Sequence, residues 1–427
     1  MARTPAPHEV APIFNPQENP DIVSRQYHVY LITPMAGGGT DSWVPDLKQP
    51  VRAQSIKGQL RFWWRTTQNA INPDELRQRE RALWGGAGSG GNDDGHASSV
   101  KILVRLTDTE ITQENIIDYK QGTVDLPDYV LFPLLARTYS KLLINLKFKL
   151  ELQIPAVNQL EVENSVKLWI LFGGLGARLS RGCGSLYSQK VMASFQTSDE
   201  IVDFLNQLQN ASQQGGNEEF PAFGRSSYPT ILNSRLAVSE PITTNSPQNL
   251  WCNLLSVFGD FHQKAGIGRN IGNGNRPGQS RWPEADAIRR ITGKASTRHS
   301  PRHHAGNWFP RGAFGLPIQT EFKNSSGDPT GKFFLQPKGK ERWPSPVILK
   351  IIQIDDQTCI KICLILNHAV PPDIELLSDT YKPHILFPNE HPMAYTGKQM
   401  PPEAEMLLSN ESPYDALFRH LKFEEVL

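Results

Sequence analysis

The chain has 427 residues, which exceeds one typical domain and predicts two domains, each with its own core. Apolar residues make up 38% and charged residues 20% of the sequence, which is typical of a folded globular protein and excludes wholesale disorder. Four widely spaced cysteines form no C-x-x-C pair, and no segment has the ~18 consecutive apolar residues that a membrane span needs. We therefore expect a cytoplasmic protein with no disulfide framework and no membrane partner.

Basic residues are unevenly distributed along the chain, although the formal net charge is only +1. Residues 261–320 contain ten Lys or Arg and two acidic residues, and residues 47–73 contain five Lys or Arg and no acidic residue. Separate basic regions of this kind are expected where one surface of a protein meets phosphate groups.

The N-terminal half predicts one α+β domain, over residues 26–200, after an irregular segment of residues 1–25. The β-branched and aromatic run 27–33 predicts a strand, and strands are also predicted at 100–106, 141–152 and 185–191. Residues Ile56, Leu60, Trp63 and Trp64 recur at helical spacing and predict an amphipathic helix with Ser55 as its N-cap. A second helix is predicted at 162–172. The order strand, helix, strand, strand, helix, strand is that of the ferredoxin-like split βαβ arrangement.

The C-terminal half predicts a second, less regular ferredoxin-like domain over residues 201–427. The polar stretch 210–219 has the composition of a linker or exposed insertion. A strand at 231–238, a helix at 249–258 and a hairpin of 346–354 with 359–366 follow it. The basic region 261–315 is expected to be a long functional loop. The predicted fold class is therefore α+β, with two ferredoxin-like (RRM-related, βαββαβ) domains.

The helix that begins near Ser55 carries a row of cations. Lys57, Arg61 and Arg65 recur every four residues and share one face, with Arg52 just before the helix. Like charges at this spacing repel each other by a few tenths of a kcal/mol per pair, so a bound polyanion explains the row better than helix stability does. The alternative is a solvated face that acidic residues from elsewhere neutralise.

The segment "GGLGARLSRGCGS" (173–185) combines five glycines with two arginines after a predicted helix. It has no Walker A pattern, and Leu179 stands where a dinucleotide fingerprint needs its third glycine, so no nucleotide cofactor is predicted. Glycines lack a Cβ and allow a nucleic-acid strand to approach the backbone, while arginines reach its phosphates. The candidate contacts are Gly174, Gly176, Arg178, Arg181 and Gly182. The alternative is a mobile connection whose glycines only end the helix.

The segment "RHSPRHH" (298–304) contains three histidines and two arginines. Such a group provides general acids and bases for a metal-independent ribonuclease, although a disordered cationic loop has the same composition. No H-E-x-x-H pattern or nearby acidic ligand accompanies the histidines, so no metal site is predicted. Further candidate phosphate contacts in this basic region are Lys264, Arg269, Arg281, Arg298 and Arg302.

Several stretches together resemble a known family: "ITPMAGGG" with "RAQSIKGQLRFWWR", then "GGLGARLSRGCGSL", then "GQSRWPEADAIRRI". They are similar to the RAMP superfamily of CRISPR proteins and, within it, to the family of first subunits of the type III-B Cmr effector complex. By position, the row of cations from Lys57 to Arg65 falls in the first motif of the family. Arg178 and Arg181 fall in its RNA-facing loop. Segments 85–99 and 205–220 match no family motif.

The resemblance implies two ferredoxin-like domains in an antiviral ribonucleoprotein whose partners are guide RNA (crRNA), complementary target RNA and the other Cmr subunits. A subunit of this kind is expected near the 3′ part of the guide. Because the family assigns target cleavage to a different subunit, the resemblance implies a non-catalytic RNA-binding chain without a cofactor. Two alternatives stay open: a guide-processing endoribonuclease that uses a histidine of residues 299–304, and a protein–protein scaffold.

Overall fold

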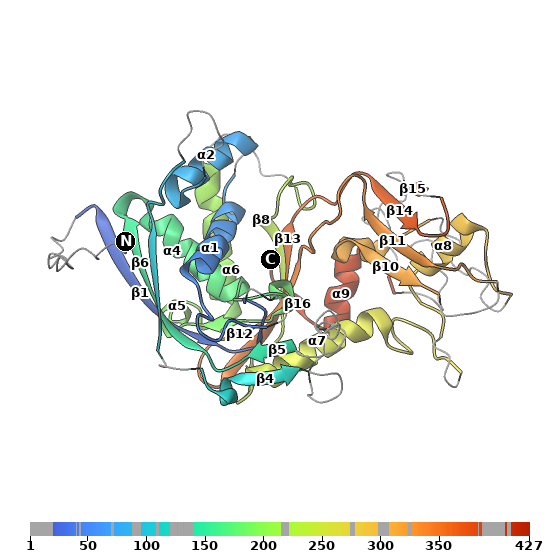
Figure 1. Cartoon of the computed structure of the whole chain (residues 1–427), viewed down its shortest axis with the longest axis horizontal. Helices are drawn as coiled ribbons and strands as arrows, with labels where there is room; N and C mark the ends of the chain where they lie inside the picture. The colour runs from blue at the N-terminus through green and yellow to red at the C-terminus, as the bar shows by residue number, and fades with distance from the viewer. Residues whose placement is uncertain are drawn as a thin grey trace, which may run out of the picture.

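The computed structural model folds the chain as a mixed α+β protein with several antiparallel sheets (Figure 1). It describes residues 20–39, 41, 44–69, 72–87, 95–107, 111–119, 126, 131, 140–214, 222–273, 278–297, 307–322, 327–382, 384–386, 406–407 and 411–427. The described helices are α1 (Ala53–Thr66), α2 (Pro73–Trp84), α4 (Gln159–Phe172), α5 (Gln189–Met192), α6 (Ser198–Gln214), α7 (Pro247–Gln263), α8 (Glu284–Thr292), α9 (Pro413–Leu421) and the 3-10 turns η1 (Gln113–Asn115), η2 (Ala156–Asn158), η3 (Leu179–Arg181) and η4 (Pro310–Phe314). The described strands are β1 (Ile22–Leu31), β2 (Met35–Ala36), β3 (Lys101–Leu106), β4 (Ile116–Tyr119), β5 (Ser140–Leu143), β6 (Lys147–Pro155), β7 (Leu186–Tyr187), β8 (Thr230–Val238), β9 (Ile242–Thr243), β10 (Ile318–Glu321), β11 (Lys332–Pro337), β12 (Val347–Gln353), β13 (Thr358–Asn367), β14 (Ile374–Ser378), β15 (His384–Leu386) and β16 (Glu424–Glu425).

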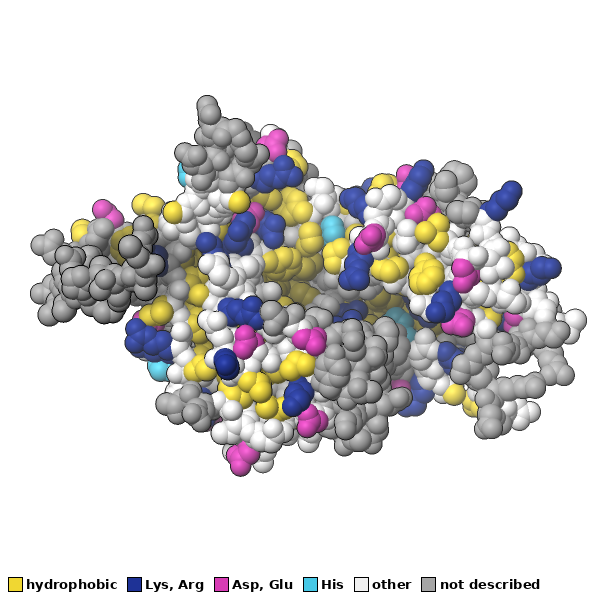
Figure 2. Space-filling view, in the orientation of Figure 1, with side chains coloured by type: hydrophobic (Ala, Val, Ile, Leu, Met, Phe, Trp, Pro, Cys, Tyr) yellow, Lys and Arg dark blue, Asp and Glu magenta, His cyan; other side chains and the backbone are white. Residues whose placement is uncertain are grey.

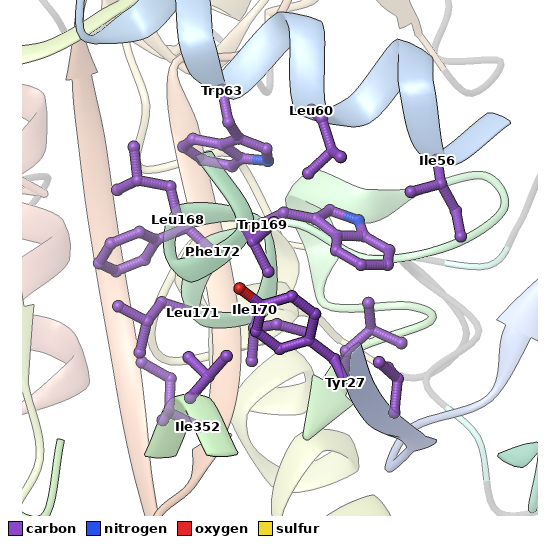
Figure 3. Packing of buried hydrophobic residues seen from close by; sticks show 14 of the residues in the cluster. Tyr27, Ile56, Leu60, Trp63, Leu168, Trp169, Ile170, Leu171, Phe172 and Ile352 are labelled. Carbon is purple, nitrogen blue, oxygen red and sulfur yellow. The ribbon is translucent and has the colours of Figure 1, made fainter. Parts of the chain in front are cut away.

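The first sheet has the strand order β3-β6-β1-β7, and its neighbours are antiparallel. Side chains alternate along β1, so that Tyr27, Val29 and Leu31 are buried while the residues between them are exposed. The buried side faces α1 and α4. Figure 3 shows how Trp63 of α1 packs against α4, as the helical spacing predicted.

The second sheet has the order β12-β13-β8-β16, with β9 paired to β13, again antiparallel. Helices α7 and α9 pack on one side of it, and helices α1, α4 and α6 of the first half pack on the other. Along β12, Ile348 and Ile352 therefore join the first core, whereas Leu349 and Ile351 join the core of α7 and α9. Because both faces are covered, β12 and β13 read in the sequence as nearly continuous apolar runs.

A third lobe is formed by two chain segments that leave the second sheet, between α7 and β12 and between β13 and α9. Its sheet has the order β10-β11-β14-β15, and α8 lies beside it (Figure 1). The lobe has a small core of its own, in which Phe309, Phe333 and Trp343 are buried. A further small sheet has the strand order β2-β5-β4.

Most predicted elements of the first half are confirmed, and three differ in detail. Helix α1 begins at Ala53 with Arg52 as its N-cap, so the predicted N-cap Ser55 is wrong. The predicted strand 141–152 is two strands of different sheets, because Asn145 adopts a φ of 55° between them. The predicted strand 185–191 is paired only at 186–187, since Ser188 starts helix α5 there.

The second half also departs from the prediction in two places. Residues 210–214, expected in a linker, form the last part of helix α6, and the expected boundary between residues 200 and 201 falls inside this helix. The basic region 261–315 is not one loop, because it contains the end of α7, all of α8 and η4. The middle of the glycine-rich segment 85–99, residues 88–94, lies outside the described residues, as do residues 215–220.

Candidate nucleic-acid interface

The row of cations on α1 has an acidic partner on the neighbouring helix α2. Arg61 Nε lies 2.7 Å from Glu80 Oε1, and Arg65 Nε lies 3.8 Å from Glu80 Oε2. Glu80 is nearly buried, whereas Arg61 and Arg65 keep about a third or more of their side chains exposed, at 35% and 44%. One carboxylate therefore serves two guanidinium groups, and the row keeps an excess of positive charge.

Lys57 is the member of this row that forms no ion pair within the described part of the chain. Its pKa is lowered, first by partial burial and then by the nearby charge of Arg61. Both effects disfavour an unpaired ammonium group and would be relieved by an anion at this position.

The start of α1 is joined to the glycine loop, residues 173–185, through the segment after β2. Arg52 Nη2 donates to the carbonyl of Gly38 at 2.5 Å and lies 3.8 Å from Asp46. The carbonyl of Ala36, two residues before Gly38, accepts a hydrogen bond from the amide of Ala177 at 2.7 Å. Three sequence-distant segments thus form one surface, which we call the α1 surface: Gly38, Arg52, Lys57, Arg61, Arg65 and residues 176–178.

The glycines of this loop allow close approach, but the group that approaches is the protein's own backbone. A Cβ on Gly176, which has a φ of +85°, would lie 2.4 Å from the carbonyl oxygen of Ala36. On Gly182, at a φ of +70°, it would lie 2.7 Å from the carbonyl oxygen of Leu349. Gly174 is similarly held against a backbone carbonyl, that of Gly184. Tight packing within the protein therefore accounts for these glycines, and contact of a nucleic-acid strand with Gly174, Gly176 and Gly182 stays a prediction.

Arg181 connects the glycine loop to the second sheet. Its Nη1 donates to the carbonyl of Val347 at 2.8 Å, and its guanidinium lies 4.8 Å from the centre of the Phe258 ring. In return, the indole of Trp251 donates to the carbonyl of Arg181 at 2.8 Å. This arginine has partners inside the protein, and contact with a phosphate stays a prediction for it.

Arg178 occupies the other side of the loop in a left-handed conformation, with a φ of 61°. Partial burial lowers the pKa of its guanidinium. The nearby Cys183 thiol is fully enclosed, and burial raises its pKa to about 12. Arg178 is thus only partly available to a ligand.

Lys350 is a residue of this region that the sequence-based reasoning missed. It stands in the middle of β12, is fully buried, and its Nζ donates to the carbonyls of Ile170 and Gly173 at 2.7 and 2.6 Å. Burial lowers its pKa well below the usual value. It therefore caps the C-terminal end of α4, where the glycine loop begins. The available signal was a single lysine inside the apolar run "PVILKIIQI".

The basic candidates of the third lobe lie apart from the α1 surface. Lys264 pairs with Asp260 at 2.6 Å, Arg269 donates to the side chain of Gln263, and Arg281 donates to the carbonyl of Gly266 at 3.0 Å. Arg298, Arg302 and the histidines of 299–304 lie outside the described residues. No group of three or more potential metal ligands occurs in the part of the chain that the structure describes.

Arg181 of the glycine loop and Arg311 of η4 both lie close to the buried His262, and Arg311 Nε lies 3.2 Å from Glu284 Oε2. The pKa of buried His262 is lowered well below its usual value, first by burial and then by Arg311 and Arg181. Burial, followed by the charge of Arg311, lowers the pKa of Arg269. Figure 2 shows a hollow between the layered sheets and the third lobe, with hydrophobic side chains on its floor and Lys and Arg side chains along its sides.

Residues 28–187 match the family model of the RAMP superfamily. This range contains most of the first sheet, α1, α4 and the glycine loop, and with them every residue of the α1 surface. Residues 28–187 are therefore a RAMP-superfamily region, and the resemblance seen in the sequence motifs is confirmed for them. No curated protein matches the chain in sequence. None of the described helices is long and apolar enough to cross a membrane.

Among solved structures, the chain is similar to the crystal structure of apo Cmr1 from Pyrococcus furiosus, at 16% sequence identity and a TM-score of 0.47. That match covers 81% of this chain and 88% of the other. It is also similar to a chain of the type III-B Cmr-beta complex bound to cognate target RNA, solved by cryo-EM, at 13% identity and a TM-score of 0.42. Here 81% of this chain and 94% of the other are covered.

Proposed function

We propose that this protein is a non-catalytic RNA-binding subunit of a type III-B CRISPR effector complex. It would contact guide RNA, target RNA or both near the 3′ end of the guide, together with the other Cmr subunits. The match of residues 28–187 to the RAMP superfamily carries the proposal. The sequence motifs that resemble the first Cmr subunit support the more specific role.

The strand orders support the finer part of the fold prediction, two ferredoxin-like domains. The first unit runs β1, α1, β3, β6, α4, β7 with the sheet order β3-β6-β1-β7. The second runs β8, α7, β12, β13, α9, β16 with the sheet order β12-β13-β8-β16. In both units the second, third, first and fourth strands are neighbours in that order, as the split βαβ arrangement requires.

RNA would lie along the α1 surface, where cations meet exposed backbone. Lys57 is the best single probe of this contact, because it has no ion-pair partner in the described chain. We expect Lys57→Gln to weaken binding of an unstructured RNA oligonucleotide regardless of sequence and to lower the slope of log K against log salt by up to about one unit. Lys338→Gln, an exposed lysine of the third lobe, is the matched control.

The arginines of the row need a compensated variant. Arg61→Gln with Arg65→Gln would leave Glu80 as an unpaired, nearly buried carboxylate and confuse loss of binding with loss of stability. Adding Glu80→Gln removes the carboxylate that would otherwise be left without a partner. If this triple variant folds and retains the affinity and salt slope of the wild type, RNA does not use this face.

The ribonuclease alternative depends on His303 and His304, which lie outside the described residues. It is tested by incubating the purified full chain with repeat RNA in EDTA. Specific cleavage that His303→Ala with His304→Ala abolishes would overturn the non-catalytic assignment. A pure scaffold would show no salt-dependent affinity for RNA.

A further inference from the structure

The open face of the first sheet, on the side opposite to α1 and α4, carries aromatic and basic side chains. Among the described residues no helix covers this face, and its exposed positions alternate with buried ones along β1 and β6. Figure 1 shows β1 and β6 at the outer margin of the molecule, with α1 and α4 on their inner side. Apart from Tyr187, which also packs against the edge of the first core, the side chains on this face are therefore not required for packing.

The strand register arranges these side chains in rows. Across the sheet, Tyr187 of β7 lies opposite Tyr30 of β1, and Tyr30 lies opposite Lys147 of β6. The two tyrosine rings are 6.1 Å apart, Lys147 Nζ lies 5.9 Å from the centre of the Tyr30 ring, and Tyr30 is 37% exposed. The first row is thus an aromatic pair with an ammonium group beside it.

The next row adds a third ring and two more cations. His28 lies opposite Lys149, and Lys149 lies opposite Arg105 of the edge strand β3. Like charges directly opposite each other in a sheet lower its stability. Packing therefore does not explain why Lys149 and Arg105 stand opposite each other. Glu151, whose pKa is lowered by a 2.8 Å contact with Lys149 and by Arg105, is one carboxylate shared by two cations.

The remaining charges define the limits of this surface. Lys147 and Lys101 form no ion pair within the described chain, so the face has an excess of positive charge. Burial, followed by the charges of Asp356 and Asp355, raises the pKa of the Tyr187 phenol. These two carboxylates mark the edge of the basic surface on the side of Tyr187.

We propose that this face binds single-stranded RNA, with bases stacked on Tyr30, Tyr187 and His28 and phosphates near Lys147, Lys149 and Arg105. Aromatic side chains on an open sheet accept any unpaired base by stacking, and cations beside them hold the backbone. A neutral protein partner would not need four cations on adjacent strands, and an acidic one would use the cations but would not need three aromatic rings between them. The proposal rests on the proposed RNA-binding function but uses a surface separate from the α1 surface.

The test measures affinity of the full chain for a labelled, unstructured uridine-rich RNA by fluorescence anisotropy. Tyr30→Ala with Tyr187→Ala is expected to weaken binding about tenfold or more, since stacking on one aromatic ring contributes about 1–3 kcal/mol per base. Tyr30→Phe keeps the ring and is expected to bind as the wild type does. A duplex RNA of the same length, whose bases are not free to stack, is expected to be unaffected by the double substitution.

A second substitution distinguishes a loss of RNA binding from a loss of stability. Lys147→Gln changes an exposed side chain and is expected to lower the salt slope without changing the melting temperature. The inference is overturned if the Tyr30→Ala, Tyr187→Ala protein binds RNA with unchanged affinity. It is also overturned if this protein still binds RNA but no longer binds another subunit of the complex. If Lys57→Gln loses affinity while the tyrosine variants do not, the proposed function stands and this surface is wrong. If the wild type binds no RNA, both are wrong.

Discussion

Lys350 shows how one buried polar side chain can connect the second sheet to the end of a helix of the first unit. Its Nζ satisfies the carbonyls of Ile170 and Gly173, which belong to the end of α4 and have no helical partner there. We expect Lys350→Met to lower the free energy of unfolding by about 1–3 kcal/mol, because the substitution leaves buried acceptors unsatisfied. Urea denaturation at neutral pH measures this loss.

The control for that measurement is on the adjacent strand. Lys361→Met removes a partly exposed lysine that donates only to the side chain of Asn253, and should cost no more than a few tenths of a kcal/mol. Equal losses for both variants would show that the contacts of Lys350 contribute nothing beyond those of a surface lysine.

His368 provides a prediction for pH dependence. Its ring stacks on Trp343 at 5.4 Å, and burial, followed by the charge of Lys340, lowers its pKa to about 4. In the unfolded chain its pKa is about 6.5, so between these values the unfolded state binds the extra proton and stability falls as the pH drops. His262 and His420, whose pKa values are also lowered, act in the same direction.

We expect His368→Phe to keep the stacking on Trp343 and to lose less stability than the wild type between pH 7 and pH 5. Denaturant unfolding at the two pH values measures the difference, and pH 8 is the reference at which the histidine of both states is neutral. An identical loss in variant and wild type would contradict the lowered pKa of His368.

At the level of single residues, the sequence predicted cations but not their partners. That Trp63 and Trp64 are buried followed from helical spacing, because position on a helix face is a local property. That Glu80 would pair with Arg61, or Arg181 with the carbonyl of Val347, depends on contacts between segments 19 and 166 residues apart. Such pairs follow only from the three-dimensional arrangement.

At the scale of elements, two glycines lead to opposite predictions for the same substitution. Gly176→Ala places a Cβ 2.4 Å from the carbonyl oxygen of Ala36 at a positive φ, and we expect a loss of about 2 kcal/mol or more. Gly58 lies inside α1 with no atom within 4 Å of its Cβ position, so Gly58→Ala should stabilise the protein by about 0.5–1 kcal/mol. Thermal unfolding of both variants measures whether each substitution lowers or raises the stability of the protein. A stabilising Gly176→Ala would contradict the tight packing of the loop.

Strands and helices were predictable where their periodicity was undisturbed. The apolar runs of β12 and β13 predicted these strands close to their observed bounds. The single strand expected over 141–152 failed because one residue, Asn145, changes the chain direction without changing the apolar pattern. Helix α6 was missed because its polar C-terminal part has the composition of a linker.

At the scale of the whole molecule, the order of elements was predictable, but the way in which the sheets share a core was not. One buried cluster runs from Tyr27 of β1 to Leu366 of β13 and includes α1, α4 and α6. A sequence reading treats each domain as having its own core, because nothing local shows that the second sheet is covered on its far side by helices of the first unit.

This shared core predicts that the two sheets unfold together and that the third lobe unfolds separately. Leu168 of α4 is fully buried in the shared cluster, whereas Phe333 of β11 belongs to the small core of the third lobe. Each truncation to Ala should cost about 2–5 kcal/mol locally. Hydrogen–deuterium exchange reports where that loss appears. We expect Leu168→Ala to accelerate exchange in both β1 and β12, and Phe333→Ala to accelerate it in β11 and β14 while β1 and β12 stay protected. Faster exchange in β1 alone after Leu168→Ala would show that the two sheets are independent units.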